Sequence, residues 1–515
     1  MLDGFANRSD FKIVSAKPYG QIYYWTFGCW DIWTLGRWDI SKYLNILTSI
    51  YPVLRRPDTN HMENLYLPIL MLTLACSQLP AQTFYRGVDL SYVNQMEDCG
   101  AVFYEDGLEK DPFQIMADHG ANVVRVRLWH DPGAYLPFPG TYSSFDDVVL
   151  TITRAKSRGM QVLLDFHYSD TWADPGRQLI PADWASMADD IPVLATALYD
   201  YTLKVLTDLN AIGLMPEFVQ VGNETNGNIL SPAGADLYPV NWTRQSTLLN
   251  AGISAVRETG KTSGIQPQII LHIANPADAD WWYGSVTANG VSDFDIIGLS
   301  FYPEWHHLSV TQTGDIIQQL IDKYGRQVML VEVGLPWTSQ WNDSAANRLS
   351  TVPAEYGTPS PQAQRNWLLD ISAEVKRRGG MGVIYWESAW VSSGCRTEWG
   401  IGSHWENATF FDFSNQLIGN GGIQFLEDLN TAVIPKGQEV AARILLFPNP
   451  AGELITVSGN QHSFYKIVDQ SGRTLREGRI NKHKSIDIGG LSPGIYILVL
   501  AAENGDRTIV RFVKT

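Results

Sequence analysis

Two acidic residues, Glu224 and Glu332, each follow a short apolar run of the kind that forms a buried strand. Glu224 lies in FVQVGNETNG (218–227), directly after Asn223, and Glu332 lies near the end of QVMLVEVG (327–334). They are 108 residues apart, and a strand-plus-helix unit takes about 30 residues or a little more. Three such units fit between them. We therefore expect the glutamates on strands four and seven of an eight-unit barrel, at the carboxyl-terminal edge that holds the catalytic groups of barrel enzymes.

Paired carboxyl groups on facing strands are what the hydrolysis of a glycosidic bond requires. One of them must carry a proton at working pH, which burial or a neighbouring negative charge allows by raising its pKa. We assign this acid role to Glu224 and expect Glu332 to be ionised and to attack the anomeric carbon. A separation of about 5–5.5 Å implies retention of configuration, and one of roughly 6.5–9.5 Å implies inversion. The alternative for either glutamate is a structural carboxylate that closes a strand.

Other polar and aromatic residues lie at or near the ends of predicted strands. Arg125 and Arg127 alternate along the second strand and so point to one face, and two arginines are costly to bury unless they are paired. One would keep Glu332 ionised and the other would brace the site; a structural ion pair is the alternative. We expect Asn223 to hydrogen-bond a sugar 2-hydroxyl and the ring of Trp386 to form the floor of the subsite that binds the reacting sugar. Further candidates for substrate binding, each of which could instead be packing, are His167, Asp170, Trp172, His272, Tyr302 and Trp390.

The four cysteines show no CxxC or Cys/His spacing that suggests zinc. If the first two are removed with a leader, Cys99 and Cys395 remain. They would lie in the loops after strands one and eight, which are neighbours in a closed barrel. We expect a disulfide between them in an oxidising compartment, with two unrelated free thiols as the alternative.

Strands and helices alternate from residue 84 to about residue 430. Amphipathic stretches such as 144–159 and 364–380 lie between the strands and predict helices that end in basic residues and glycine. Near-continuous apolar runs that fit a parallel sheet buried on both faces occur at 84–92, 122–129, 160–168, 218–224, 268–274, 294–303, 327–334 and 382–390. This eightfold alternation predicts an α/β fold, a (β/α)8 TIM barrel over residues 82–430. Loops 130–143 and 388–408 would form the walls of a cleft.

The segment before the barrel has a different character. Residues 1–61 are rich in Trp and Tyr without clear periodicity, and we interpret them as a non-native extension ahead of a true initiator, Met62. We expect a signal peptide at 62–81. Its apolar core, Leu65–Ala75, is too short to span a bilayer and suits a secretory segment. A lipid-anchored start at Cys76 is the alternative.

The segment after the barrel changes pattern once more. After a linker at 431–441, short alternating strands separated by Gly, Pro, Asn and Ser turns predict a small all-β sandwich over 442–515.

The composition bounds the class of partner. The chain has 515 residues, 45% of them hydrophobic and 18% charged, which describes a globular chain with ample core. Its net charge of −16 argues against nucleic acid or an anionic membrane as the main partner and suits a neutral, soluble ligand. We expect a monomer.

Several motifs together resemble the arabinogalactan endo-β-1,4-galactanases of glycoside hydrolase family 53. They are YRGVDLSYVNQMEDCG, NVVRVRLWHDP, LLDFHYSDTWADPGRQ, QVGNETNGNIL, GLSFYP, LVEVGLPW and YWESAW, and HYSDTWADP is the most specific piece. The resemblance covers about residues 84–430. It implies a polysaccharide substrate, cleavage of internal β-1,4 bonds in pectic galactan side chains, with Glu224 as acid/base and Glu332 as nucleophile. The family's strand-two arginine falls on Arg125, and the asparagine before its acid/base falls on Asn223.

The resemblance also bears on metals and on competing functions. No cofactor is expected. Some bacterial members of the family bind calcium in the last βα loops, but GCRTEWGIGSHWENATFFDF is compact and lacks a clear Asp-rich ligand run, which leaves calcium open. The alternatives are another endo-acting hydrolase of the same clan, such as a mannanase or glucanase, and a non-catalytic sugar-binding surface protein.

The C-terminal segment resembles the sorting domain of type IX secretion cargo from the Bacteroidetes, with FPNPAGELITV early, LSPGIYILVL late and a closing RFVKT. This resemblance implies the type IX machinery as a partner and export across the outer membrane, so that the protein is secreted or held at the cell surface. A small carbohydrate-binding or spacer module is the alternative.

Overall fold

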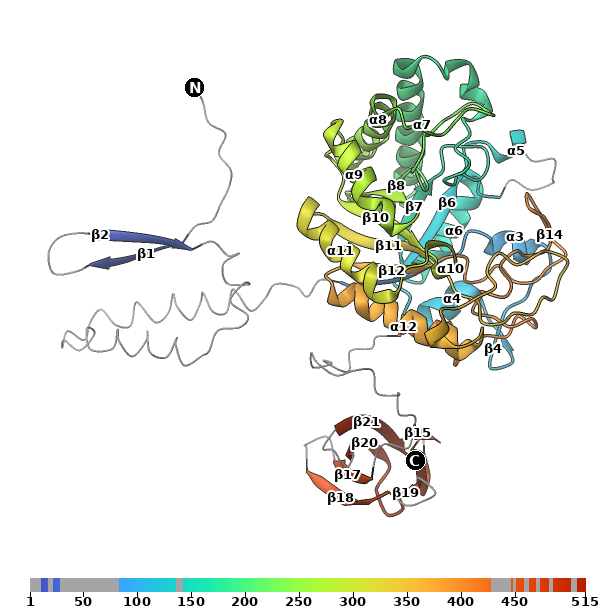
Figure 1. Ribbon diagram of the computed structural model, residues 1–515. Coiled ribbons are helices and arrows are strands. Elements are labelled where there is room, and N and C mark those ends of the chain that lie inside the picture. Colours follow the sequence, from blue (N-terminus) through green and yellow to red (C-terminus); the bar gives the residue numbers. More distant parts are fainter. Residues whose placement is uncertain are drawn as a thin grey trace. The chain divides into compact units, whose positions relative to one another are not determined.

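The structure is a computed structural model (Figure 1) that describes residues 11–16, 22–27, 83–135 and 142–427. It also describes 446–515 apart from gaps at 448–450, 458–462, 469–472, 481–484 and 502–506. The first unit, Met1–Phe84, contains an antiparallel hairpin of β1 (Phe11–Ala16) and β2 (Ile22–Phe27). The rest of the expected extension at 1–61, the signal peptide at 62–81 and the linker at 431–441 lie outside the described residues.

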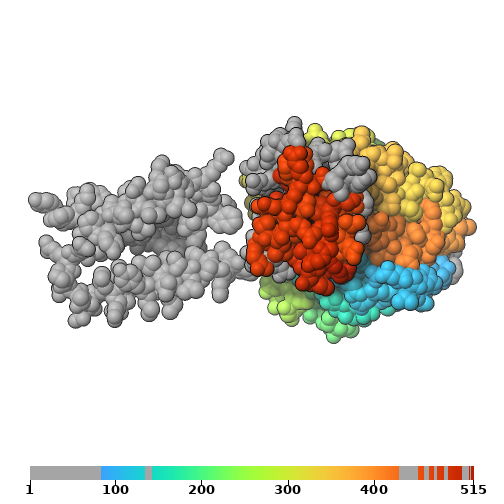
Figure 2. All heavy atoms as spheres, turned by 90° about the horizontal axis from the view of Figure 1, so that it is seen from below, coloured from blue at the N-terminus to red at the C-terminus, as the bar shows by residue number. Residues whose placement is uncertain are grey.

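Eight parallel strands close into a barrel, which confirms the predicted TIM-barrel fold. In barrel order they are β3 (Tyr85–Asp89), β6 (Val123–Leu128), β7 (Gln161–Phe166), β8 (Phe218–Val221), β9 (Gln268–Ile273), β10 (Ile296–Phe301), β11 (Gln327–Val333) and β12 (Gly382–Tyr385). The eighth strand pairs with the first, Gly382 opposite Tyr85, and this pairing closes the sheet. In the space-filling view of Figure 2, the orange part of this domain adjoins its blue part, as the pairing of the eighth strand with the first requires.

The strands are shorter than predicted at their carboxyl ends. The fourth ends at Val221 because Gly222 and Glu224 turn the chain with φ of 88° and 44°. The eighth ends at Tyr385, five residues earlier than predicted, and Glu387 has φ of 45°. The residues that were predicted to extend these strands instead form the turns that carry the polar groups.

Helices cover the outside of the barrel (Figure 1). The predicted helices at 144–159 and 364–380 are α6 (Phe145–Ser157), which Ser144 caps, and α12 (Pro361–Arg377), which Ser360 caps. The other α-helices of the described barrel are α3 (Val93–Asp98), α4 (Pro112–Asp118), α5 (Pro132–Tyr135), α7 (Ile191–Ala211), α8 (Trp242–Gly260), α9 (Ala279–Ala288), α10 (Pro303–His306) and α11 (Val310–Tyr324). Short strand pairs lie in the loops, β4 (Tyr104–Glu105) with β5 (Leu108–Glu109) and β13 (Arg396–Thr397) with β14 (Gly400–Ile401).

The barrel interior changes from apolar to polar along the strands. Its apolar layer consists of Val123, Leu163, Phe218, Ile270, Ile296, Met329, Val331, Met381 and Ile384, all buried. Side chains two positions apart on a strand share a face. Arg125 therefore follows Val123 on the inner face, and the same step leads from apolar residues to Asp165, Gln220 and His272. The polar layer therefore packs on a layer of buried apolar side chains, which separates it from water at the amino-terminal end of the barrel.

The C-terminal segment forms two antiparallel sheets, which confirms the predicted small β domain. One holds β15 (Leu446–Phe447), β16 (Leu454–Val457) and β19 (Ser485–Asp487), and the other holds β18 (Thr474–Arg479), β17 (Phe464–Val468), β20 (Gly494–Ala501) and β21 (Arg507–Lys514). Their shared core includes Ile455, Ile467, Ile486, Leu498 and Phe512.

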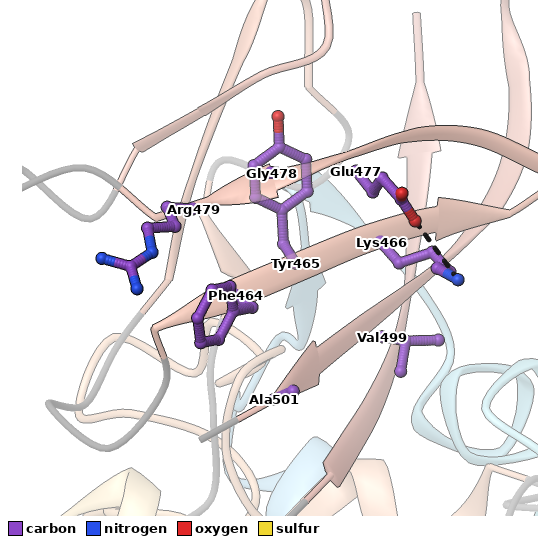
Figure 3. A pocket seen from close by; sticks show the side chains of 8 residues that line it. All are labelled: Phe464, Tyr465, Lys466, Glu477, Gly478, Arg479, Val499 and Ala501. Carbon is purple, nitrogen blue, oxygen red and sulfur yellow. Dashed lines mark ion pairs between the residues drawn. The ribbon is translucent and has the colours of Figure 1, made fainter. Parts of the chain in front are cut away.

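The four-stranded sheet of this domain also carries a pocket of about 500 Å³ (Figure 3). Phe464, Lys466, Glu477 and Arg479 are among the side chains that line it, and Lys466 pairs with Glu477 at 3.3 Å.

Candidate active site

Glu224 sits on a tight turn directly after β8. Its φ of 44° is left-handed, a conformation that costs about 1–3 kcal/mol for a residue other than glycine. Gly222 opens the turn at φ 88°, and a Cβ there would meet Thr225 Cγ2 at 2.5 Å, so this position needs glycine. The backbone N–H of Thr225 donates to the carbonyl of His272 on β9 at 2.9 Å. The Gly-Asn-Glu-Thr sequence therefore forms a turn that the next strand holds in place.

The carboxyl group of Glu224 is partly buried and accepts a hydrogen bond from the Ser300 hydroxyl, 2.6 Å from Oε1. Burial raises its pKa well above the usual range, and the negative charge of Glu332 raises the pKa further. A carboxyl group in these surroundings retains its proton at a pH where an exposed glutamate has lost it. Glu224 is therefore suited to act as the acid.

Glu332 lies inside β11 and is 6% exposed. Its Oε1 is 2.8 Å from Nη2 of Arg125, and its Oε2 accepts a hydrogen bond of 2.9 Å from the Tyr302 hydroxyl. Burial raises the pKa of Glu332 to about 6, while the charge of Arg125 and the Tyr302 hydrogen bond act in the opposite direction. Glu332 is therefore ionised above about pH 6, as a nucleophile must be.

The Arg125 guanidinium binds three carboxylates at once. It donates to Asp89 Oδ2 at 2.8 Å and to Asp165 Oδ2 at 2.7 Å, in addition to its ion pair with Glu332. The Arg125 side chain is 1% exposed, so these contacts are made away from water. Such a buried cation is stable only because several carboxylates surround it, and it fixes the position of Glu332.

Arg127 lies on the same face of β6 but belongs to a separate ion pair. Its guanidinium donates to the Glu387 carboxylate and lies over the rings of Tyr92 and Trp172, at 4.1 and 4.4 Å from their centroids. Burial raises the pKa of Glu387 to about 8, and the charge of Asp89 also raises it. The arrangement matches a structural pair that holds an aromatic wall, which is the alternative that the sequence left open for one arginine.

Three of the candidate polar residues are engaged within the protein. Asn223 Oδ1 accepts from Arg125 at 2.8 Å, and its Nδ2 donates to the Ala173 carbonyl at 2.7 Å. The second Nδ2 hydrogen has no partner among the described residues.

His167 and Asp170 belong to the supporting structure. His167 Nε2 lies 3.0 Å from Asp165. Asp170 accepts from the backbone N–H groups of Asp131 and Ala182, at 2.9 and 2.8 Å, and so fastens the loops after β6 and β7.

The candidate tryptophans divide into two groups. The rings of Trp172 and Trp386 lie 5.8 Å apart, and Trp386, half-buried, also packs edge-on against Trp405. Trp390 is 1% exposed and stacks on Tyr92 with 4.0 Å between centroids, so its faces serve packing rather than a sugar. Trp399 is 41% exposed and lies 5.9 Å from Trp172, and the sequence interpretation missed it.

Sequence reasoning also missed buried polar residues that support the two glutamates or pair with Arg127. Each is a polar residue in or directly after an otherwise apolar strand: Asp89, Asp165, Gln220, Ser300 and Glu387. All five are 1% exposed or less. The usable signal was this isolated polarity, since a buried arginine on one strand requires carboxylates on the neighbouring strands.

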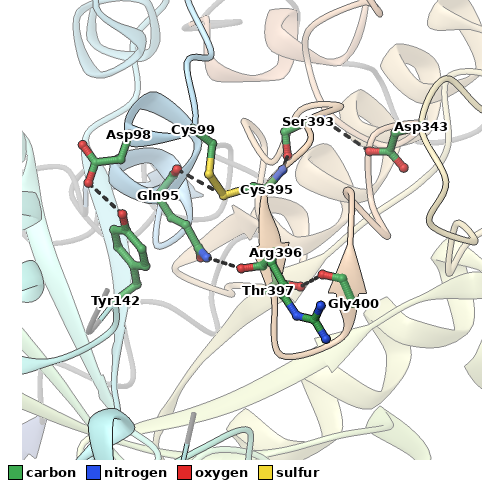
Figure 4. Close-up of a disulfide and its surroundings, with 10 residues drawn as sticks. All are labelled: Gln95, Asp98, Cys99, Tyr142, Asp343, Ser393, Cys395, Arg396, Thr397 and Gly400. Carbon is green, nitrogen blue, oxygen red and sulfur yellow. Dashed lines mark hydrogen bonds between the residues drawn. A yellow bond between two sulfur atoms is a disulfide. The ribbon is translucent and has the colours of Figure 1, made fainter. Parts of the chain in front are cut away.

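A disulfide joins Cys99, after α3, to Cys395, in the loop after β12, with 5.5 Å between their Cα atoms (Figure 4). It links the loops that follow strands one and eight. Near it, Asp343 Oδ2 accepts from the N–H groups of Ser393 and Ser403, at 3.2 and 2.6 Å, which ties the loop after β11 to the loop after β12.

Within the described residues, no group of three or more His, Cys, Asp or Glu side chains converges as metal ligands do. No helix in the described ranges has the length and apolar character needed to cross a membrane.

A closed eight-stranded parallel barrel with a partly buried glutamate after strand four and a buried glutamate on strand seven, whose charge raises the pKa of the first, defines the class of (β/α)8 glycosidases. Comparison with known proteins narrows this class. Residues 85–420 match the model of glycosyl hydrolase family 53, and the chain belongs to this family. Residues 445–515 match the secretion system C-terminal sorting domain.

Individual relatives agree with the family. The chain is 49% identical over 347 residues to an arabinogalactan endo-beta-1,4-galactanase of Cellvibrio japonicus, a match that covers 67% of this chain and 91% of the relative. Among solved structures, the Ignisphaera aggregans GH53 catalytic domain matches with a TM-score of 0.61 at 30% identity, covering 68% of this chain and 97% of that one. A structure from a study of two fungal beta-1,4-galactanases matches with a TM-score of 0.56 at 30% identity, covering 67% and 99%.

Proposed function

We propose that the chain is an endo-acting, retaining galactanase that cleaves internal β-1,4-galactosidic bonds of galactan and arabinogalactan I, the side chains of pectin. The observation that carries this proposal is the pair of glutamates with opposite surroundings, in a barrel whose relative at 49% identity is named an arabinogalactan endo-beta-1,4-galactanase. The family membership supports a glycosidase, and the relative supports galactan as the substrate.

In the first step the Glu332 carboxylate attacks the anomeric carbon, and the glycosidic carbon–oxygen bond breaks. Glu224 gives its proton to the departing oxygen, so the leaving sugar departs as an alcohol and a galactosyl ester forms on Glu332. Arg125 and Tyr302 hold one Glu332 oxygen each and orient the carboxylate for attack. They also favour its ionised form before the attack.

In the second step water replaces the ester. The Glu224 carboxylate takes a proton from the water while the oxygen of the water bonds to the anomeric carbon. The bond between Glu332 and the sugar breaks, and Glu332 leaves as a carboxylate. Two inversions give net retention. Asn223, with one amide hydrogen free among the described residues, is the proposed partner of the sugar 2-hydroxyl, and Trp172 with Trp386 is the proposed aromatic surface for the reacting sugar.

A polysaccharide panel tests the proposal directly. We expect rapid release of reducing ends from β-1,4-galactan, with little from β-mannan or β-glucan, and a first-formed product with the β-anomer in proton NMR. Preferred cleavage of mannan or glucan would identify another endo-glycanase of the clan. Binding of galactan without hydrolysis would support a glycan-binding protein. An α-anomer as first product would indicate inversion.

We also propose that the type IX machinery exports the protein and that it ends at the cell surface or in the medium, after loss of a signal peptide at 62–81. The sorting-domain match over 445–515 supports this route. A strain that expresses the chain without residues 442–515 should retain it in the periplasm. Normal export of the truncated protein would contradict a sorting role, and N-terminal sequencing of exported protein tests Met62 as the initiator.

Treatment of the purified enzyme with a chelator tests whether the loops after β11 and β12 bind calcium. If the loops after β11 and β12 bind no calcium, treatment with EDTA should leave the melting temperature and the galactanase activity unchanged. A drop in either that added calcium restores would assign a metal to these loops.

A further inference from the structure

His272 on β9 contacts the catalytic turn through its backbone and through its ring. Its carbonyl oxygen accepts from the N–H and the hydroxyl of Thr225, at 2.9 and 3.0 Å. Its ring Nδ1 accepts from the backbone N–H of Glu224 at 3.3 Å, and its ring Nε2 lies 2.9 Å from the Ser300 hydroxyl. The imidazole is fully buried, so these are contacts within the protein interior.

The donors around the ring identify which nitrogen carries its proton. Burial, together with the charge of Arg125, holds the pKa of His272 well below its usual value, so the ring is neutral and carries one proton. The Glu224 N–H and Gln220 Nε2, the latter at 2.9 Å, both supply hydrogens toward Nδ1. Gln220 Nε2 has two hydrogens, and the other one is directed to Asp165 Oδ1 at 2.6 Å. Asn223 Oδ1 also lies 3.0 Å from Nδ1, but it already accepts from Arg125 at 2.8 Å. The proton therefore belongs on Nε2, and Nε2–H donates to Ser300.

The last hydrogen bond of this series leads back to Glu224, whose backbone N–H donates to His272. Because the Ser300 oxygen accepts from His272, its own hydrogen is available, and it points to Glu224 Oε1 at 2.6 Å. The hydrogen bonds thus run from the Glu224 backbone through His272 and Ser300 to the Glu224 carboxyl. Among the described residues, no group hydrogen-bonds the other oxygen, Oε2.

We propose that His272 and Ser300 are positioning residues that keep Oε1 of Glu224 as a hydrogen-bond acceptor throughout the reaction and thereby dedicate Oε2 to the transferred proton. The inference deepens the proposed function and rests on it. In the first step the proton leaves Oε2 for the glycosidic oxygen, and in the second step a water proton returns to Oε2. The loop of bonds also stabilises the left-handed backbone of Glu224, because the same histidine holds the N–H of that residue.

The Ser300 hydroxyl stabilises the carboxylate form of Glu224 and so lowers its pKa. The pH dependence of activity should therefore change when this hydroxyl is removed. The other groups that act on the Glu224 carboxyl are Glu332 and Asp174, which raise its pKa, and Arg125, which lowers it; Tyr302 faces the same pair. Ser300→Ala changes none of these charges. A shift in the titration of Glu224 therefore measures the hydroxyl.

The test compares Ser300→Ala with the unaltered full-length enzyme on galactan across pH. We expect the alkaline limb of kcat/KM to move up by roughly one pH unit, and kcat at the optimum to fall about tenfold, because a hydrogen bond to a charged group is lost. In Ser300→Thr, which retains a hydroxyl, the alkaline limb of kcat/KM should lie at the same pH as in the unaltered enzyme. Ser246→Ala is the matched control: it removes another buried serine hydroxyl, on α8, that has no partner among the described residues.

A second measurement does not depend on catalysis. In protein labelled with ¹³C at the glutamate side-chain carboxyl, the signal that Glu224→Gln removes should titrate at higher pH in Ser300→Ala than in the unaltered chain. An unchanged titration together with an unchanged alkaline limb would overturn the inference. If the unaltered chain cleaves no polysaccharide, the proposed function fails instead, and the NMR titration still decides the role of Ser300.

Discussion

The surroundings of Glu224 and of Glu332 differ in one respect on which their proposed roles depend. Glu332 has a guanidinium on one oxygen and a phenol on the other, whereas the only side chain that hydrogen-bonds the carboxyl group of Glu224 among the described residues is a serine. Burial raises the pKa of both, but only Glu332 has a direct cationic partner. In the proposed mechanism, one amino-acid type therefore supplies both the acid and the nucleophile, because their partners differ.

Loss of the nucleophile should have the largest effect. Glu332→Gln keeps the shape of the side chain but cannot form the galactosyl ester, so we expect kcat on galactan to fall by about four orders of magnitude or more. Initial rates of reducing-end release measure this, with circular dichroism to verify the fold. Retention of more than a hundredth of the activity would contradict the assignment of Glu332.

Loss of the acid should lower the rate less than loss of the nucleophile, and the size of the fall should depend on the leaving group. Glu224→Gln removes the proton donor, a contribution of about 10²–10⁴-fold, so we expect a fall of about a thousandfold on galactan. An aryl β-galactoside with a good leaving group needs no proton for departure, and the first step on it should be nearly unaffected. Equal losses on both substrates would show that Glu224 does not act as the acid.

The pH profile should reflect the two pKa values directly. Activity requires ionised Glu332 and protonated Glu224, so kcat/KM should fall tenfold per pH unit below about pH 6, where Glu332 gains a proton. On the alkaline side it should fall as Glu224 loses its proton, at a pH well above that of an ordinary glutamate. A profile without an acidic limb between pH 5 and 7 would argue against this assignment of the two roles.

The two arginines of β6 offer a matched pair of smaller changes. Arg125→Lys keeps the charge but loses the planar fork that reaches Asp89, Asp165 and Glu332. We expect kcat to fall about 10–100-fold and the acidic limb to move upward, because the carboxylate of Glu332 is less stabilised. Arg127→Lys, in contact with Glu387 instead, should leave the limb in place. A limb that moves equally in both variants would remove the distinction between them.

The disulfide should have the smallest effect on rate. Cys99 and Cys395 join loops rather than strand ends, so Cys99→Ser combined with Cys395→Ser should change kcat less than twofold. We expect the free energy of unfolding to fall by about 2–4 kcal/mol, since the bridge constrains the unfolded chain. Thermal or urea unfolding measures the loss, and reduction of the unaltered protein should reproduce it.

The sequence alone was enough to predict the fold. Eight apolar runs at regular spacing determine a closed parallel sheet, because each strand must be buried on both faces and each crossover needs a helix. The same spacing placed Glu224 and Glu332 on strands four and seven; the structure has Glu332 on strand seven and Glu224 in the turn that directly follows strand four. Strand ends were less predictable, since left-handed turns at Glu224 and Glu387 end their strands early.

Only the tertiary structure decided which partner each side chain meets. A pattern of apolar and polar residues indicates the face on which Arg125 or Arg127 lies, but not that Glu387, 260 residues away along the chain, pairs with Arg127. It also could not separate a buried Trp390 from an exposed Trp399. Partners and exposure depend on contacts between distant segments, and those contacts, rather than residue type, set the pKa values that distinguish the acid from the nucleophile.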